Sequence, residues 1–322
     1  MIWQQSSFKS LGLESGVALI TAMLITALVS LVALDLVSRQ QLDIRRTSNL
    51  LDQDQAWLYC LGMEAWSSRI LARDATRGPV DHLHEEWAMQ LPPLPVEGGG
   101  LIGELIDQQG LFNLNNLLHG GAIDPAEMAR FQRLLIGLEI PADVAEGLAH
   151  SLADWLDADQ DRRFPGGAED QDYLMLRPAY RAANAPLRSV SELRLVKGFI
   201  PKIYRAVLPF VTVLPEMTQI NINTAPIPVI VSLVPELRPM EAAAIIEGRG
   251  ARGYQNVGIL QQHPALAGKG AFLSQGAGIS VASRWFMAHG RATVGRVSVE
   301  FYSLLFRNQG TVIPVQRTIG AW

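Results

Sequence analysis

The chain has 322 residues, a net charge of −4 at pH 7 and one cysteine. This length allows two domains and a membrane anchor. The slightly acidic balance gives no support for a nucleic-acid partner, and a lone cysteine excludes an intrachain disulfide. Cys60 lies among Leu58, Leu61 and Met63, so we interpret it as a small buried hydrophobic side chain.

The most informative segment is apolar and runs from residue 17 to residue 34. It has no charged side chain before Asp35, and it is long enough to cross a bilayer core of about 30 Å. Its polar side chains are hydroxyls that can bond back to the helix backbone, namely Thr21, Thr26 and Ser30. No second stretch is apolar over a membrane width, so the sequence predicts a single-pass membrane protein.

The predicted helix continues beyond the membrane to about Leu71, and a small polar leader that ends at Gly16 precedes it. A secretory signal peptide has the opposite order, with a basic region, a shorter apolar core and then small residues. The arrangement resembles the class III signal of type IV pilins and type II secretion pseudopilins. That resemblance implies that a prepilin peptidase cuts after Gly16 and that the new amine of Val17 is methylated. An ordinary signal anchor is the alternative for this segment taken alone.

The fifth residue after the implied cleavage site is Thr21, where most pilin-like proteins carry glutamate. Its absence is typical of the K-type minor pseudopilin. The charges flanking the membrane segment indicate the opposite orientation, because Lys9 precedes the span whereas Arg39, Arg45 and Arg46 follow it. We give the leader and the motifs below more weight, and expect the body of the protein on the periplasmic side of the inner membrane.

Beyond the long helix, Pro79 and the proline- and glycine-rich run at residues 91–100 predict a loop. Residues 101–107 read as a short strand, followed by a turn at residues 108–110. Helical periodicity dominates from Pro125 to about Leu273. The last quarter alternates polar and apolar residues, which predicts an antiparallel three-strand meander from Ile279 to Ile319.

These elements predict an α+β, pilin-like fold: a long N-terminal transmembrane helix and an antiparallel sheet, with a large all-α domain inserted into it. We expect a leader at residues 1–16, the membrane segment at 17–38 and a periplasmic continuation of the helix at 39–78. The sheet should use residues 79–117 and 276–322, and the inserted domain residues 118–275.

The densest polar cluster has seven carboxylates between residues 154 and 173. An EF-hand does not fit, because Arg162 occupies the sixth loop position, where glycine is needed, and Glu169 comes one place late. A calcium loop of another kind fits better, with acidic residues folding back across a Pro-Gly-Gly bend. We expect Ca²⁺ to be held by Asp157, Asp159, Asp161, Glu169 and Asp170. The alternative is a solvated acidic loop neutralised by Arg162 and Arg163.

Further motifs carry the resemblance to K-type pseudopilins. They are Asp107, Gly110, Phe112, Asn113 and Asn115 before the helical segment, and Tyr173, Asn184-Ala185-Pro186 and Ser189 to Leu193 after the acidic loop. The resemblance implies calcium in the helical domain. It also implies assembly with other minor pseudopilins at the tip of the periplasmic pseudopilus, above the major pseudopilin, in support of the export of folded proteins across the outer membrane.

A rival interpretation comes from residues 220–249, which resemble a helix-hairpin-helix DNA-binding module. The glycines that would offer amides to a phosphate are replaced by Glu236-Leu237-Arg238, so we favour a structural role without nucleic acid. The alternative function is a membrane-anchored DNA-uptake protein. We find no catalytic set: the six histidines are scattered, and nucleophile and nucleotide-binding motifs are absent. The protein is not expected to be an enzyme.

Overall fold

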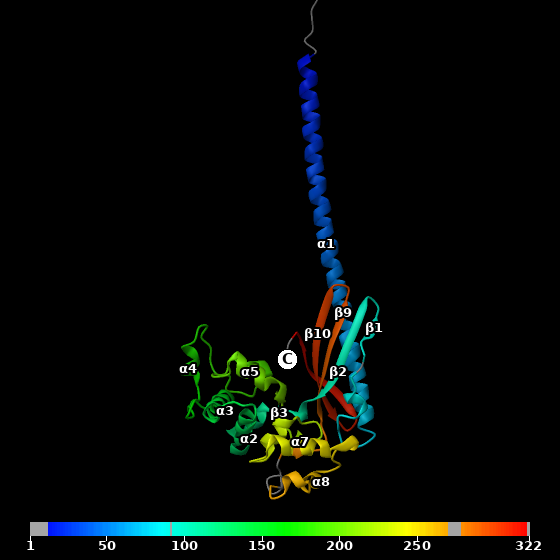
Figure 1. Ribbon diagram of the computed structural model, residues 1–322. Helices are drawn as coiled ribbons and strands as arrows, with labels where there is room; N and C mark the ends of the chain where they lie inside the picture. Colours follow the sequence, from blue (N-terminus) through cyan, green and yellow to red (C-terminus); the bar gives the residue numbers. More distant parts are fainter. Residues whose placement is uncertain (1–11, 91, 270–277, 321–322) are drawn as a thin grey trace, which may run out of the picture.

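The computed structural model describes residues 12–90, 92–269 and 278–320. Residues 1–11, which belong to the predicted leader, lie outside the described residues. Helix α1 (Gly12–Asp74) extends far beyond the rest of the molecule (Figure 1). Among the described residues it is the one helix long and apolar enough to cross a membrane.

The hydroxyls of the apolar segment bond to the helix backbone as predicted. Thr21 Oγ1 donates to the carbonyls of Val17 and Ala18 at 3.0 Å, and Ser30 Oγ donates to Thr26 O at 2.7 Å. Thr26 Oγ1 donates to a main-chain oxygen in the same way. These bonds satisfy the polar atoms inside the helix, so the segment can be placed in hydrocarbon without unpaired hydroxyls.

The described residues contain an antiparallel five-stranded sheet in the order β1-β2-β9-β10-β11. Its strands are β1 (Leu94–Val96), β2 (Gly99–Asp107), β9 (Trp285–Val294), β10 (Val297–Asn308) and β11 (Thr311–Ile319). The predicted C-terminal meander is confirmed, and Gln309 and Gly310 join β10 to β11 with φ angles of 46° and 84°. Two positive φ angles in a two-residue loop match the twist of an antiparallel hairpin.

Two predictions about strands were wrong in detail. The run at residues 91–100 is not only a loop, because Val96 pairs with Gly99 and starts the β1–β2 hairpin. Pro95 is tolerated there since β1 is an edge strand. The strand expected from residue 279 onward is divided into β8 (Ile279–Ser280) and β9, and β8 pairs with β7 (Ile220–Asn221) outside the large sheet.

The C-terminal part of α1, from about Ala56 to Leu71, packs on one face of the sheet and forms an apolar core with it. Cys60 is fully buried there, as predicted. Met63 lies over Gly103 and Gly290, which are paired across β2 and β9. A Cβ atom on Gly290 would lie 2.2 Å from the Met63 Sδ atom, so the Met63 side chain occupies space that the two glycines leave open.

The middle of the chain is a separate, mainly helical region, which we define as residues 111–269 and 278–280. Its α-helices are α2 (Pro125–Gly137), α3 (Ala142–Leu156), α4 (Asp170–Leu174), α5 (Pro201–Val207), α6 (Ile227–Leu233), α7 (Pro239–Gly248) and α8 (Val257–Gln261). The region also has two-residue strands: β3 (Phe112–Asn113), β4 (Leu118–His119) and β5 (Ala122–Ile123) before α2, β6 (Val211–Thr212) and β7 between α5 and α6, and β8 after α8. Helices dominate this region as predicted, but the inserted domain, expected to be all-α, also contains these short strands.

Local signals explain these short helices. At the start of α2, Asp124 Oδ1 accepts hydrogen bonds from the amides of Ala126 and Glu127, and Pro125 occupies the first turn. Helices this short are marginal alone. They are held by a shared apolar core that includes Phe112, Phe131 and many aliphatic side chains.

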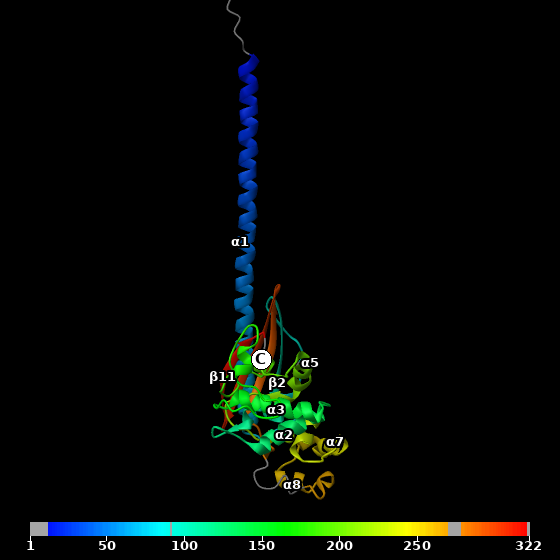
Figure 2. The same ribbon diagram turned by 90° about the vertical axis from the view of Figure 1, so that its left-hand side faces the viewer.

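The helical region leaves the sheet at the end of β2 and returns at the start of β9. Asp107 and Phe286 are neighbours across these strands, so the whole region is inserted at one end of a strand pair. It lies beside the sheet and beyond its end farther from the free part of α1 (Figures 1 and 2). We use "body" below for the sheet together with residues 51–90, which include the part of α1 packed on it.

Candidate functional site

The acidic loop begins at the end of α3. The apolar side of this helix, including Leu148 and Leu152, is buried in the helical core. The same turns bury Asp154 completely, and Asp157 forms the C-cap with 3% of its surface exposed. Carboxylates are rarely buried in this way without a cationic partner.

One partner comes from the loop itself. The Arg163 Nη1 atom lies 2.8 Å from Asp154 Oδ1 and 2.5 Å from Asp157 Oδ2, and the Arg163 amide donates to Asp154 Oδ2. The loop can close so tightly because of its glycines. A Cβ on Gly167 would lie 2.2 Å from Asp154 Oδ2, and Gly166 has a φ of 89°.

Three of the five predicted calcium ligands come together. Asp157, Asp159 and Glu169 each place one carboxylate oxygen so that these atoms lie within 4.8 Å of one another. The other two carboxylates lie outside this group. Asp161 is exposed, and Asp170 Oδ1 accepts a hydrogen bond from the amide of Ala182 at 3.0 Å. The group of converging carboxylates is thus smaller than the sequence predicted.

Asp161 is separated from the group by a local turn. Its amide donates to Asp159 Oδ1 at 2.8 Å, which bends the chain immediately after Asp159. The acidic residues of this stretch therefore do not remain on one side of an extended loop. Arg162 and Lys197 both pair with Asp172 at the outer side of the loop.

The electrostatics of the group favour a bound cation. Burial, together with the charges of Asp154, Asp157 and Asp159, raises the pKa of Glu169 to about 7. Burial also raises the pKa of Asp157, although Arg163 acts in the opposite direction. Four carboxylates face one guanidinium here, so three negative charges remain when all the acids are ionised.

The oxygen atoms of the group also have unused hydrogen-bonding capacity. Within the described part of the chain, both carboxylate oxygens of Asp157 and of Glu169 are buried without a hydrogen-bond donor, although Arg163 lies close to Asp157 as an ion pair. Buried acceptors of this kind normally have a partner. A hard divalent cation with oxygen ligands would supply it, so the residues present fit Ca²⁺.

Sequence reasoning gave no role to two polar residues at or next to the end of α3. Asp154 was counted among the acidic residues but was not assigned a role, although it lies three residues before Asp157 on the same helix face. Asn184 was quoted only as part of a motif. Its backbone N–H donates to Trp155 O at 3.0 Å, and its side-chain Oδ1 atom is buried with no hydrogen bond among the described residues.

The predicted processing site lies within α1. Gly16 and Val17 are both in the helix, Val17 is 63% exposed, and a Cβ on Gly16 would meet no atom within 4 Å. The side chain of Thr21 is hydrogen-bonded to its own helix, so it offers no carboxylate and no free hydroxyl hydrogen to a neighbouring chain.

The hairpin that resembles a DNA-binding module joins α6 to α7. Glu236 has a φ of 60°, and its carbonyl accepts a hydrogen bond from Lys269 Nζ at 2.9 Å. Lys269 and Arg238 both pair with Glu241. The cations at this hairpin are thus engaged in internal ion pairs, and Leu237 is buried in the helical core.

Two family models match the chain. Both are described as type II secretion system (T2SS), protein K, and they match residues 110–216 and residues 220–281. The chain is also similar to the type II secretion system protein K of Pseudomonas aeruginosa, at 39% identity over 95% of this chain and 93% of that protein. The protein of the same name from Klebsiella pneumoniae is 33% identical over 96% of this chain and 97% of its own length.

The fold has a solved counterpart. It matches a chain in the crystal structure of the GspK-GspI-GspJ complex from the enterotoxigenic Escherichia coli type 2 secretion system, with a TM-score of 0.78 and 28% identity. The match covers 86% of this chain and all of that chain. With family models over more than half of its length and relatives aligned almost from end to end, this chain belongs to the type II secretion system protein K family.

Proposed function

We propose that this protein is a minor pseudopilin of the type II secretion system that assembles with other minor pseudopilins at the tip of the periplasmic pseudopilus. There it supports the export of folded proteins across the outer membrane. The observation that carries the proposal is the match to a chain of the GspK-GspI-GspJ complex over the whole length of that chain. The partners are therefore pseudopilins of the I and J types, with the major pseudopilin below them.

The shape of the molecule supports a place at the end of a filament. The helical region lies to one side of the body and beyond its far end (Figures 1 and 2). A filament built by repeating α1 at short intervals has no room for this bulk in every subunit, whereas the terminal subunit has free space ahead of it. Thr21 agrees with this position, because a terminal subunit has no neighbour ahead whose amine would need a carboxylate.

Helix α1 would anchor the protein in the inner membrane, with the body in the periplasm. Its apolar residues from Val17 to Leu34 are exposed over their whole length, which suits contact with lipid or with the helices of partners. A prepilin peptidase would act at Gly16, and Val17 would become the methylated first residue. The function is mechanical, and a catalytic activity is not part of the proposal.

Calcium is the proposed structural cofactor of the helical region. Asp157, Asp159 and Glu169 would hold it, with Asp154, through Arg163, helping to fix Asp157. The cation would neutralise the excess negative charge of the loop. In its presence the loop would keep the end of α3 and the start of α4 together, and with them the adjoining surface of the helical region.

The test is complementation in a bacterium that lacks its own protein K gene. The full chain should restore secretion of a folded substrate into the medium, measured as enzyme activity in the culture supernatant. A matched chain without residues 111–280, with a short linker between β2 and β9, should reach the membrane but fail to restore secretion. Equal secretion with and without the full chain, at equal levels of the other pseudopilins, would overturn the proposal.

A further inference from the structure

The body and the helical region have separate apolar cores. The core of the body lies between α1 and the sheet, and the core of the helical region is built from side chains that include those of α2, α3 and α6. The apolar cluster between them is small. It consists of Leu214 from the helical region and Trp285, Met287 and Leu304 from the sheet, with Tyr302 and Phe306 packed against it. Four buried apolar side chains are too few to fix the orientation of the helical region relative to the body by packing alone.

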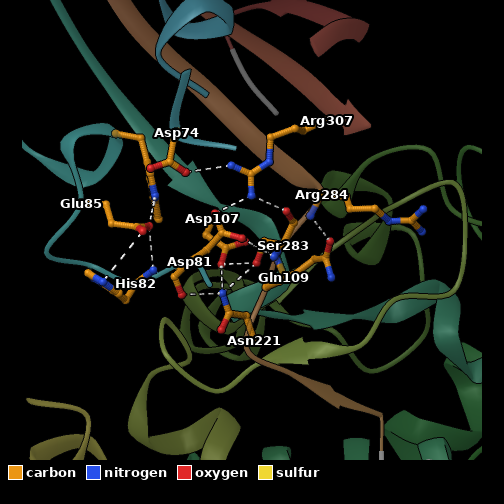
Figure 3. A network of polar contacts seen from close by, with 12 residues as sticks. Asp74, Asp81, His82, Glu85, Asp107, Gln109, Asn221, Ser283, Arg284 and Arg307 are labelled. Atoms are coloured by element: carbon orange, nitrogen blue, oxygen red, sulfur yellow. Dashed lines mark hydrogen bonds and ion pairs between the residues drawn. The ribbon is translucent and has the colours of Figure 1, made fainter. Parts of the chain in front are cut away.

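A buried polar network lies beside this small cluster (Figure 3). At its centre, Asp107 Oδ2 accepts hydrogen bonds from Asn221 Nδ2 at 3.0 Å, Thr224 Oγ1 at 2.6 Å and Ser283 Oγ at 2.6 Å. Asp107 Oδ1 accepts a fourth from the amide of Gln109. A single carboxylate at the end of β2 is therefore bonded to two residues of the helical region and to the segment that returns to the sheet.

Arg307 of β10 completes the network from the side of the body. Its guanidinium lies 2.9 Å from Asp74 Oδ2 at the end of α1, contacts Asp81 Oδ1, and donates to Ser283 O at 2.8 Å. Asp81 Oδ2 accepts from the amide of Ser283, and the carbonyl of Asp81 accepts from Asn221 Nδ2. Asn221 is thus bonded to both Asp81 and Asp107, and it is completely buried.

The network has an excess of negative charge. Three carboxylates are buried here, those of Asp74, Asp81 and Asp107, and the guanidinium of Arg307 pairs with the first two. The remaining charged groups nearby do not correct the excess. Glu85 places a carboxylate oxygen within 4.8 Å of oxygens of Asp74 and Asp81 and so adds to the excess, and its Oε1 atom lies 3.8 Å from His82 Nε2. Arg284 is turned away to Glu216 at 2.7 Å. Such a cluster is most stable when it holds a proton.

We propose that this junction of Asp81, Asp107, Asn221 and Arg307 is a proton-dependent latch that fixes the helical region on the body and loosens when a proton leaves it. The segments that it joins are far apart in the chain and come from α1, the loop after α1, β2, β10, and β7 within the helical region. Loosening the latch lets the helical region change its orientation at the tip while both apolar cores stay intact.

The direction of the response follows from the buried acids. Burial raises the pKa of Asp81 to about 7, against the opposing charge of Arg307, and the charge of Asp107 adds to the rise. Burial raises the pKa of Asp107 as well. A carboxylate whose pKa is higher in the closed state binds a proton more strongly there, so this contribution to closure is complete below the ordinary pKa of 3.8 and is lost as the pH rises to about 7.

The experiment measures the distance between the two parts in the full chain in detergent micelles. Spin labels are attached to cysteines introduced at Arg296, in the turn between β9 and β10, and at Met240, which is 84% exposed on α7. Cys60 remains unlabelled because it is buried. Double electron–electron resonance then gives the distance distribution from about pH 5 to about pH 8.5, a range that covers much of the interval between the ordinary pKa of an aspartate and the raised pKa of Asp81.

The latch predicts a narrow distribution at the acidic end and a broader or shifted one at the basic end, with no further change once the pH is well above 7. Asp81→Asn, which imitates the protonated side chain, should keep the narrow distribution throughout. Asp54→Asn, the same change at an exposed position on α1, should respond to pH like the unaltered chain. An unaltered chain with the same distribution at every pH overturns the proposal, whether or not the Asp81 variant folds. A response that persists in folded Asp81→Asn overturns it too.

Discussion

Replacing Glu64 by glutamine removes one carboxylate from the interface between α1 and the C-terminal strands. Glu64 is 6% exposed, and its Oε2 atom accepts hydrogen bonds from Ser303 Oγ at 2.6 Å and Arg317 Nε at 2.7 Å. Its Oε1 atom accepts from Arg317 Nη2 at 2.8 Å. These bonds tie the last strand, β11, and its neighbour β10 to the helix, so the variant tests what holds the edge of the sheet on α1.

The size of the effect follows from this geometry. Hydrogen bonds to charged groups contribute about 1.5–3 kcal/mol each, and glutamine can replace only one acceptor of the bidentate pair. Arg317 keeps 46% of its side chain exposed and regains water when released, which reduces the loss. We expect Glu64→Gln to lower the free energy of unfolding of the body by about 2 kcal/mol, or about 4–8 °C in Tm.

The same site predicts a pH dependence. Burial by itself would raise the pKa of Glu64, but the bonds from Arg317 and Ser303 outweigh burial and lower it. A carboxylate whose pKa is lowered in the folded state stabilises the protein at pH values above its unfolded pKa of 4.5. This stabilisation is lost as the pH falls through the folded pKa. The unaltered protein should therefore lose stability on acidification in a component that Glu64→Gln lacks.

Thermal unfolding of the full chain in detergent, followed by tryptophan fluorescence at neutral and acidic pH, measures both effects. The control is Glu86→Gln, because Glu86 pairs with Arg73 and Arg77 at the surface, where such pairs contribute about 0–1 kcal/mol. The reasoning is refuted if Glu64→Gln unfolds at the same temperature as the Glu86 variant and keeps the full acid response.

Three further predictions concern processing, metal and assembly. Gly16 replaced by leucine should leave uncut protein in the membrane, detected by intact mass, and normal processing of that variant would contradict the implied cleavage site. Chelation of calcium should lower the Tm of the full chain, since calcium at about 100 times its Kd would add about 2.7 kcal/mol to the free energy of unfolding. An unchanged melting curve, with no metal found by elemental analysis, would contradict calcium binding and favour the solvated acidic loop. Leu58 is 64% exposed on α1, and Leu58→Asp should weaken the pull-down of pseudopilin partners without changing the circular dichroism spectrum. Leu71 is buried, and Leu71→Asp should unfold the body. Intact assembly with Leu58→Asp would move the interface away from this face of α1.

The elements with strong periodicity could be predicted from the sequence. The long apolar run of α1 and the alternation in β10 and β11 show a single pattern over many residues, and Gln309-Gly310 marks the turn between those strands. The short strands of the helical region could not be found in this way. A strand of two residues such as β7 has no period, and it exists because β8 lies next to it in space.

The candidate site was predictable in its chemistry and less so in its membership. Residue types placed the acidic loop, but the bend after Asp159 and the bond from Ala182 to Asp170 depend on local geometry that composition does not contain. The polar junction was not anticipated at all. Its members Asp81 and Arg307 are separated by more than two hundred residues, and no local pattern relates them.

The most direct test of the account is co-purification of the full chain with I-type and J-type pseudopilins from the same secretion system. The three proteins are co-expressed in one bacterium, with an affinity tag on this chain, and are solubilised from its membranes in detergent. Native mass spectrometry then measures the mass of the purified species. The account predicts a single complex that contains all three proteins and that is reduced when Leu58 is changed to aspartate. Recovery of this chain alone, while the I-type and J-type proteins are present and folded in the same membranes, would contradict it.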